Sequence, residues 1–259
     1  VIAHRADWRN FPENSLEAIE SAIKMGVDIV ELDVHRTADG ALVICHDKTI
    51  NRTTNGKGKI AELTLDSIRN CRLRAGHNAV TRYKMPTREE ALDVCKGRVL
   101  INLDKAVNYY DQIMDMLVAR KMADQVIMKS SKTAPYMKKF FSKHDVNMLY
   151  MPIISPANES QKAMFDEFLA GEPQLAYEIC WGEYTPEVEA AMQRLIADGS
   201  KLWVNSLWNS LCGGLSDDVA WVTSAEEVYG KLVEMGATMI QTDRPEYLLD
   251  YLRSQGLHD

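Results

Sequence analysis

The sequence predicts a (β/α)8 TIM barrel, a closed ring of parallel strands surrounded by helices, with a small insertion after the second strand. Short runs rich in β-branched residues alternate with amphipathic helical patterns from one end of the chain to the other. Eight such units follow one another, and 259 residues is a typical length for one barrel of this kind. We therefore expect residues 1–259 to form a single barrel domain.

An open, doubly wound sheet is the alternative, and the lack of a glycine-rich phosphate loop after the first strand disfavours it. The expected strands are residues 1–4, 28–34, 99–104, 125–130, 148–153, 175–181, 202–205 and 238–242. The first helix carries Leu16, Ile19 and Ile23 on one face and has Asn14 as its expected N-terminal cap. The later helices are expected at residues 88–96, 109–121, 134–144, 160–170, 186–198, 225–235 and 245–255.

Residues 35–85 interrupt this alternation. A turn sequence around Asp39 and Gly40 predicts a hairpin, in which residues 42–46 form the returning strand. With the turn centred on these two residues, Asp33 lies opposite His46. We expect the segment to form an inserted hairpin and loop over the C-terminal mouth of the barrel.

Composition excludes several classes of function. The net charge is −7 and no basic stripe is present, so we expect no nucleic-acid partner. No run of about 18 apolar residues is present, so we expect no transmembrane segment. The five scattered cysteines weakly favour a reducing compartment. A first strand that opens at Val1 without a methionine slightly favours a periplasmic or secreted protein, although artificial shortening of the chain explains it equally well.

The second expected strand places two carboxylates inside the barrel. Because side chains alternate along a strand, Glu31 and Asp33 share one face while Val30, Leu32 and Val34 share the other. If the aliphatic face packs against the helices, the two acids point inward near the C-terminal mouth. A hard divalent cation with oxygen ligands relieves their repulsion, whereas salt bridges to basic side chains are the alternative.

Two histidines are candidates for proton transfer. The hairpin returns His46 to the two acids, and His4 ends the first strand at the mouth where barrel active sites lie. The planar guanidinium of Arg5 suits phosphate oxygens. Glu13 and Asn14 follow in the first loop, where they either contribute to the site or only cap the helix.

Three further strands add candidates at the same mouth. Asp104 on the third strand offers a third carboxylate to a metal. Lys129 on the fourth faces inward if Val126 and Met128 face outward, and an inward lysine requires an anionic partner. Trp203 on the seventh strand is a candidate for contact with the substrate.

In order and spacing, these residues resemble the signature of the glycerophosphodiester phosphodiesterases. The run from residue 27 to 58 is the most specific part, and the match is looser beyond Asp104. The matching motifs are His4-Arg5, Pro12-Glu13-Asn14, Glu31-Leu32-Asp33, Thr37-Ala38-Asp39-Gly40, His46-Asp47, Arg52-Thr53-Thr54-Asn55-Gly56, Pro86-Thr87, Trp203-Val204-Asn205 and Thr242-Asp243-Arg244-Pro245.

The resemblance implies metal-dependent hydrolysis of a small-molecule glycerophosphodiester to sn-glycerol 3-phosphate and an alcohol. It implies that Glu31 and Asp33 bind one divalent ion, Mg²⁺ or Ca²⁺, that His4 and His46 act as general acid and base, and that Arg5 holds the phosphate. A phosphoinositide-type or lysophospholipid-type phosphodiesterase on the same barrel is one alternative. A non-catalytic barrel that binds a phosphodiester is another.

The sequence departs from the family pattern at three positions. Ala6 replaces a common glycine, Asp104 replaces the glutamate that serves as third metal ligand, and Ala106 replaces a lysine. Strand alternation directs Lys105 outward unless the strand has already ended. We therefore hypothesise that Lys129 supplies the missing positive charge.

Overall fold

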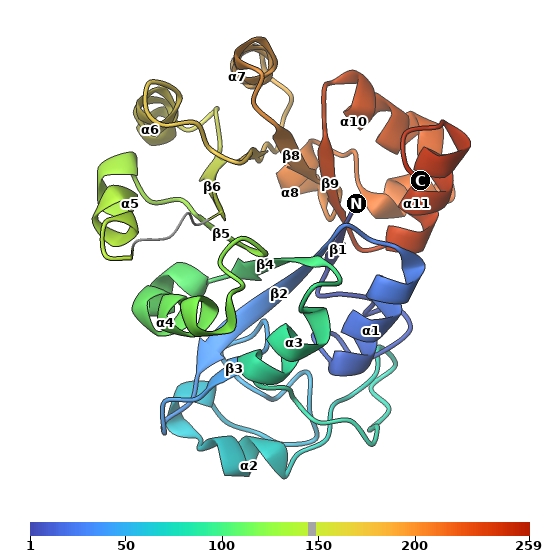
Figure 1. Ribbon diagram of the computed structural model, residues 1–259. Helices are drawn as coiled ribbons and strands as arrows, with labels where there is room; N and C mark the ends of the chain where they lie inside the picture. The colour runs from blue at the N-terminus through green and yellow to red at the C-terminus, as the bar shows by residue number, and fades with distance from the viewer. Residues whose placement is uncertain (145–148) are drawn as a thin grey trace.

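The computed structural model describes residues 1–144 and 149–259, and in these ranges eight parallel strands close into a barrel (Figure 1). Around the ring the order is β1-β9-β8-β7-β6-β5-β4-β2, and β1 pairs with β2 to close it. The strands are β1 (Ile2–His4), β2 (Ile29–Arg36), β4 (Leu100–Asp104), β5 (Val126–Ser130), β6 (Leu149–Ile154), β7 (Tyr177–Ile179), β8 (Leu202–Asn205) and β9 (Met239–Thr242). The expected fold class is confirmed, although Met148, the expected start of the fifth strand, lies outside the described residues.

Helices surround the ring, as expected for this fold (Figure 1). They are α1 (Leu16–Met25), α3 (Arg88–Cys95), α4 (Tyr110–Arg120), α5 (Ala134–Phe141), α6 (Glu159–Leu169), α7 (Pro186–Asp198), α10 (Lys231–Glu234) and α11 (Pro245–Ser254). The helix expected at 225–235 starts as a wider π-helical turn (Glu226–Gly230) before α10. Two short helices in the loop after β8, α8 (Asn209–Cys212) and α9 (Asp217–Val222), were not expected. No helix in the described ranges has the length and apolarity of a membrane span.

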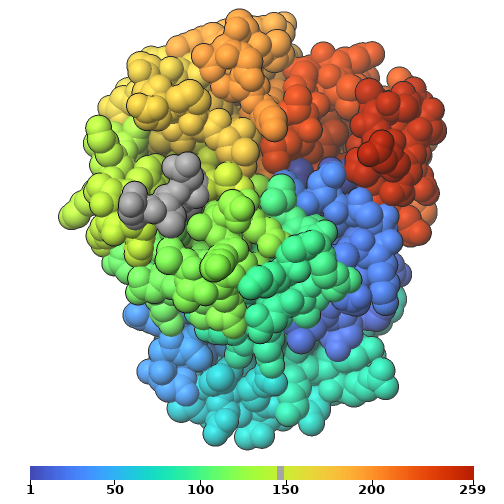
Figure 2. Space-filling view, in the orientation of Figure 1, coloured from blue at the N-terminus to red at the C-terminus, as the bar shows by residue number. Residues whose placement is uncertain are grey.

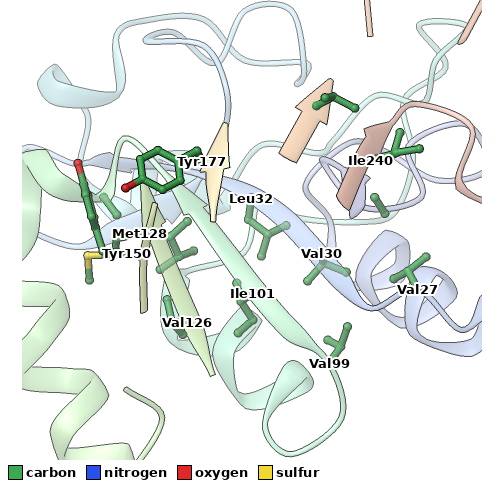
Figure 3. Close-up of a cluster of buried hydrophobic side chains, with 14 of the residues drawn as sticks. Val27, Val30, Leu32, Val99, Ile101, Val126, Met128, Tyr150, Tyr177 and Ile240 are labelled. Atoms are coloured by element: carbon green, nitrogen blue, oxygen red, sulfur yellow. The ribbon is translucent and has the colours of Figure 1, made fainter. Parts of the chain in front are cut away.

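Alternation along the strands separates an apolar outer layer from a mixed interior. Outward side chains such as Val30, Leu32, Ile101 and Met128 are buried in the layer between the barrel and its helices (Figure 3). The inward side chains at the N-terminal end form an apolar floor of Ile2, Ile29, Ile127, Met151, Ala176 and Trp203. Because the floor is apolar, the inward polar groups are concentrated at the C-terminal mouth.

The cap of α1 corrects one expectation. Ser15, rather than Asn14, occupies the N-cap, and its hydroxyl accepts a hydrogen bond from the Ala18 amide over 3.1 Å. Asn14 takes a left-handed conformation with φ of 59°, which asparagine tolerates better than most residues. Its side chain is therefore free to turn toward the barrel interior, where it bonds to Asp33.

The hairpin forms as expected, but its register differs by one residue. β3 (Leu42–Ile44) runs antiparallel to β2, and Asp33 lies opposite Cys45, whose amide donates to the Asp33 carbonyl over 2.9 Å. His46 is therefore one residue beyond its expected position opposite Asp33. The cause is a turn of three residues rather than two, closed by Gly40 with φ of 87°.

The insertion beyond β3 has its own small apolar core. It contains a 3-10 turn (Ile60–Glu62) and α2 (Leu65–Arg69), and it lies at one edge of the barrel, in blue and cyan in Figure 2. The buried side chains of this core are Val43, Cys45, Ile50, Ile60, Ile68, Leu73 and Met85. This separate core stabilises the insertion in a defined conformation beside the C-terminal mouth of the barrel.

Leu32→Ala tests the outer layer, because Leu32 is fully buried on the outward face of β2. Removing a buried leucine leaves a cavity, and we expect a loss of about 2–5 kcal/mol in the free energy of unfolding, measured with denaturant. Val222→Ala is the control, since Val222 is among the exposed apolar side chains and should change stability by about 0.5 kcal/mol or less. A similar small loss in both variants would contradict this packing.

Candidate active site

Three carboxylates converge at the C-terminal mouth. Glu31 and Asp33 come from β2, and the parallel register with β4 places Asp104 beside Asp33. One carboxylate oxygen from each of the three lies within 4.8 Å of the others. Glu31 and Asp33 are only 2% and 1% exposed. The expected acidic cluster is therefore assembled by strand register alone.

The charge on this cluster is only partly compensated. Burial, and then the neighbouring Asp33 carboxylate, raise the pKa of Glu31 to about 7. Burial also opposes ionisation of Asp33, but the Lys105 ammonium outweighs it and lowers the pKa of Asp33. Carboxylate oxygens at this spacing, with charge left over, fit a hard divalent cation such as Mg²⁺ or Ca²⁺.

Lys105 points into the site, because the strand has already ended before it, which is the alternative that the sequence left open. β4 ends at Asp104, and Lys105 takes a left-handed conformation with φ of 62° that turns its side chain back toward the mouth. Its ammonium donates to Asp33 Oδ1 and lies 3.5 Å from Asp104 Oδ2. Lys105 therefore places a positive charge beside the acidic cluster, one residue before Ala106.

Lys129 faces inward, as the alternation predicted, but its charge is already matched. Its ammonium is 3.1 Å from Glu178 Oε2, on β7. Burial lowers the pKa of Lys129, yet Glu178, Asp104 and Glu31 more than reverse this, so the side chain stays charged. Trp203 has no exposed surface, and its ring lies 5.5 Å below this ammonium. The Trp203 ring therefore packs beneath the Lys129 ammonium. Its full burial argues against contact between Trp203 and a substrate.

His4 is oriented by the carboxylate of Asp243, which directly follows the last barrel strand, β9. Its Nδ1 donates to Asp243 Oδ1 over 2.7 Å, and the same oxygen accepts from Trp8 Nε1 over 2.7 Å. Burial lowers the pKa of His4, but the Asp243 hydrogen bond and the Glu31 charge raise it above its usual value. With Nδ1 occupied, Nε2 is the ring nitrogen left for a ligand.

His46 repeats this arrangement on the insertion. Its Nδ1 donates to Asp47 Oδ1 over 2.8 Å, and its side chain is 38% exposed at the mouth. His35, at the end of β2, donates from Nε2 to the His46 carbonyl over 3.0 Å. Sequence analysis did not identify His35, although the same alternation that aligned Asp33 places it on the inward face.

The backbone after β1 turns sharply to deliver Arg5. Arg5 and Ala6 are both left-handed, with φ of 53° and 61°, which explains why glycine is common at the Ala6 position in the family. This turn aims the Arg5 amide at Glu31 Oε2, 3.0 Å away. The guanidinium then reaches Glu13 and approaches Asp33 to within 3.8 Å.

Glu13 and Asn14 both contribute to the site, rather than only capping the helix. Asn14 Nδ2 donates to Asp33 Oδ2 over 3.2 Å. Glu13 accepts from Arg5 and also from Arg52 on the insertion, whose guanidinium binds Asp47 as well. The hydrogen bonds that Arg52 donates to Asp47 lower the pKa of Asp47. Arg52 thus connects the first barrel loop to Asp47, the residue that holds His46.

Comparison with known proteins agrees with this geometry. A model described as the glycerophosphoryl diester phosphodiesterase family matches residues 4–156, and one described as a domain of unknown function matches residues 150–252. A glycerophosphodiester phosphodiesterase of Caldanaerobacter subterraneus is 27% identical over 99% of this chain and 98% of its own. Human glycerophosphodiester phosphodiesterase 1 is 43% identical, but over only 37% of this chain and 30% of its own.

Solved structures share the fold. A glycerophosphoryl diester phosphodiesterase from Parabacteroides distasonis aligns with a TM-score of 0.80 at 23% identity, over 98% of this chain and 86% of that one. An Oleispira antarctica phosphodiesterase in complex with the product sn-glycerol-3-phosphate aligns with a TM-score of 0.71 at 19% identity, over 97% and 96%. Because the family model covers more than half of the chain, this protein belongs to the glycerophosphoryl diester phosphodiesterase family and is a phosphoric diester hydrolase.

Proposed function

We propose that this enzyme hydrolyses glycerophosphodiesters to sn-glycerol 3-phosphate and an alcohol, with His4 and His46 as general acid and base. The main observation behind the proposal is that the two imidazoles have the same hydrogen-bonding arrangement. Each has its Nδ1 bound to a carboxylate, Asp243 or Asp47, and each stands at the mouth that holds the acidic cluster. The names of the relatives support the substrate class.

Glu31, Asp33 and Asp104 would hold one divalent cation, Mg²⁺ or Ca²⁺. When bound, the cation polarises a phosphate oxygen and favours ionisation of the attacking group. Arg5 and Lys105 stand beside the same carboxylates and stabilise negative charge that develops on the phosphate oxygens.

The two histidines divide the proton transfers. One accepts a proton from the nucleophile, which is water or a neighbouring substrate hydroxyl, as its oxygen bonds to phosphorus. The other donates a proton to the alkoxide as the bond between phosphorus and the leaving oxygen breaks. If the substrate hydroxyl attacks, this step gives a cyclic phosphodiester, which water then opens to sn-glycerol 3-phosphate. Because each imidazole has its Nδ1 bound to a carboxylate, Asp243 or Asp47, each has Nε2 left for the proton transfer, and either histidine can fill either role.

The alternative of a lysophospholipid-type substrate requires an apolar approach to the mouth. Trp208, which is 45% exposed, stands edge-on to His4 with 5.9 Å between ring centroids and is the feature that favours it. Comparing water-soluble glycerophosphodiesters with lysolipids in one assay separates the two substrate classes.

His4→Ala and His46→Ala should each lower kcat by about 10²–10⁴, because each removes one proton-transfer group. His258→Ala is the matched control, since His258 bonds to Asp28 away from the mouth and should leave kcat unchanged. Steady-state kinetics on a soluble diester measures the effect. Retention of more than half the turnover in either mouth variant would reject the assignment.

Cation affinity should depend on pH through Glu31. Its carboxylate must lose a proton to bind a cation, and its pKa is raised to about 7, so binding should weaken as pH falls below about 7 and level off above it. Calorimetric titration with Mg²⁺ and Ca²⁺ from pH 6 to 8 measures this, and excess chelator should abolish turnover reversibly. Full turnover in chelator would exclude the metal role.

Lys105→Met and Lys129→Met separate the two lysines. Lys105→Met should lower kcat/KM by about tenfold or more while the protein stays folded, because it removes a charge-assisted contact at the mouth. Lys129→Met should chiefly lower stability, by about 3–5 kcal/mol, because it leaves Glu178 buried without its partner. If instead Lys129→Met is stable and inactive, the earlier hypothesis that Lys129 replaces the missing lysine is correct.

A further inference from the structure

A pocket of about 350 Å³ lies between the first barrel loop and the insertion. Trp8 and Glu13 line it from the barrel, and Arg52, Arg74 and Asn78 line it from the insertion. Its volume falls within the range of about 300–1,000 Å³ that small-molecule sites occupy. The proposed proton-transfer groups do not line it.

The barrel wall of this pocket is shared with the catalytic mouth. Glu13 Oε1 accepts from Arg5 Nη1 over 3.2 Å, so one carboxylate separates the pocket from the guanidinium placed for phosphate. Trp8 Nε1 donates to Asp243, the partner of His4. The pocket therefore adjoins the position proposed for the phosphate, on the side of the insertion.

One positively charged side chain that lines the pocket, Arg74, has no carboxylate partner among the described residues. Arg52 and Glu13 form two hydrogen bonds and neutralise each other. The hydrogen bonds of Arg74 go to carbonyl oxygens, from Nε to Thr54 over 2.8 Å and from Nη1 to Asn78 over 2.8 Å. Within residues 1–144 and 149–259, no carboxylate lies within salt-bridge distance of Arg74. The pocket therefore presents a net positive charge.

The wall that carries Arg74 is held in a fixed shape. It is a tight hairpin in which the Ala75 amide donates to the Ala79 carbonyl and the Asn78 amide donates to the Ala75 carbonyl, each over 2.9 Å. Fixing the guanidinium in advance lowers the entropic cost of binding an anion. The pocket is also poorly suited to a quaternary ammonium group, because the Arg9 guanidinium already covers the Trp8 ring at 4.5 Å.

We propose that this pocket binds the alcohol substituent of the diester and that Arg74 selects substituents carrying a negative charge. The inference rests on the proposed function, because it needs the phosphate to lie beside Arg5. It assigns to the insertion a role in substrate selection in addition to supplying His46.

Three diesters test the selection: glycerophosphoglycerol, the same compound with a phosphate on its terminal hydroxyl, and glycerophosphocholine. The wild-type enzyme should favour the phosphorylated compound in kcat/KM. Arg74→Gln should lower kcat/KM about tenfold for that compound, about twofold or less for glycerophosphoglycerol, and not at all for glycerophosphocholine. Added salt should shrink the difference in the wild type, because it screens the charge.

Arg72→Gln is the matched control, since Arg72 also lies on the insertion but its guanidinium donates to the Arg69 and Cys71 carbonyls outside this pocket. Equal losses for all three diesters in Arg74→Gln, or a wild-type preference for the choline compound, would overturn the proposal. Calorimetric binding of the same compounds separates it from the reaction itself. If no diester is turned over, the proposed function fails, while binding of the phosphorylated compound that depends on Arg74 would still support the pocket.

Discussion

The structure depends on the burial of negative charge at one end of an otherwise apolar barrel. Alternation along β2 sends Glu31 and Asp33 inward together, and the floor beneath them is built from apolar side chains. Neither acid can leave the interior without reversing the face of the whole strand, which would put both carboxylates into the apolar layer under the helices and turn Val30 and Leu32 into the barrel. The repulsion is therefore permanent, and the surrounding groups are arranged to offset it.

Left-handed backbone turns deliver those groups. Arg5, Asn14 and Lys105 all have positive φ, and all three direct an N–H toward Glu31 or Asp33. A non-glycine residue in this conformation costs about 1 kcal/mol or more, and the contact with a buried carboxylate offsets that cost. At Arg5 and Lys105 the strain lies directly after a strand, and at Asn14 it lies directly before the N-cap of α1, where the chain can change direction without breaking a ladder of hydrogen bonds.

This explains what the sequence could and could not predict. The strands, the inward face of β2 and the inward direction of Lys129 follow from the alternation of apolar and polar side chains along a strand, which can be read directly from a sequence. The period alone could not decide the direction of Lys105, because alternation holds only while a strand continues and the chain leaves β4 after Asp104 in a left-handed turn. The hairpin register failed for a similar reason, since Gly40 fits both a two-residue and a three-residue turn.

The insertion is a structural part of the active site. One of the two proposed proton-transfer groups comes from the barrel, where Asp243 holds His4, and the other comes from the insertion, where Asp47 holds His46. Glu13 joins the two halves, because Arg5 approaches its carboxylate from the barrel and Arg52 from the insertion. Since Arg52 also binds Asp47, a shift of the insertion would misplace His46 and loosen Arg5 together. The same ion-pair network thus links the support of His46 on the insertion to Arg5 beside the acidic cluster.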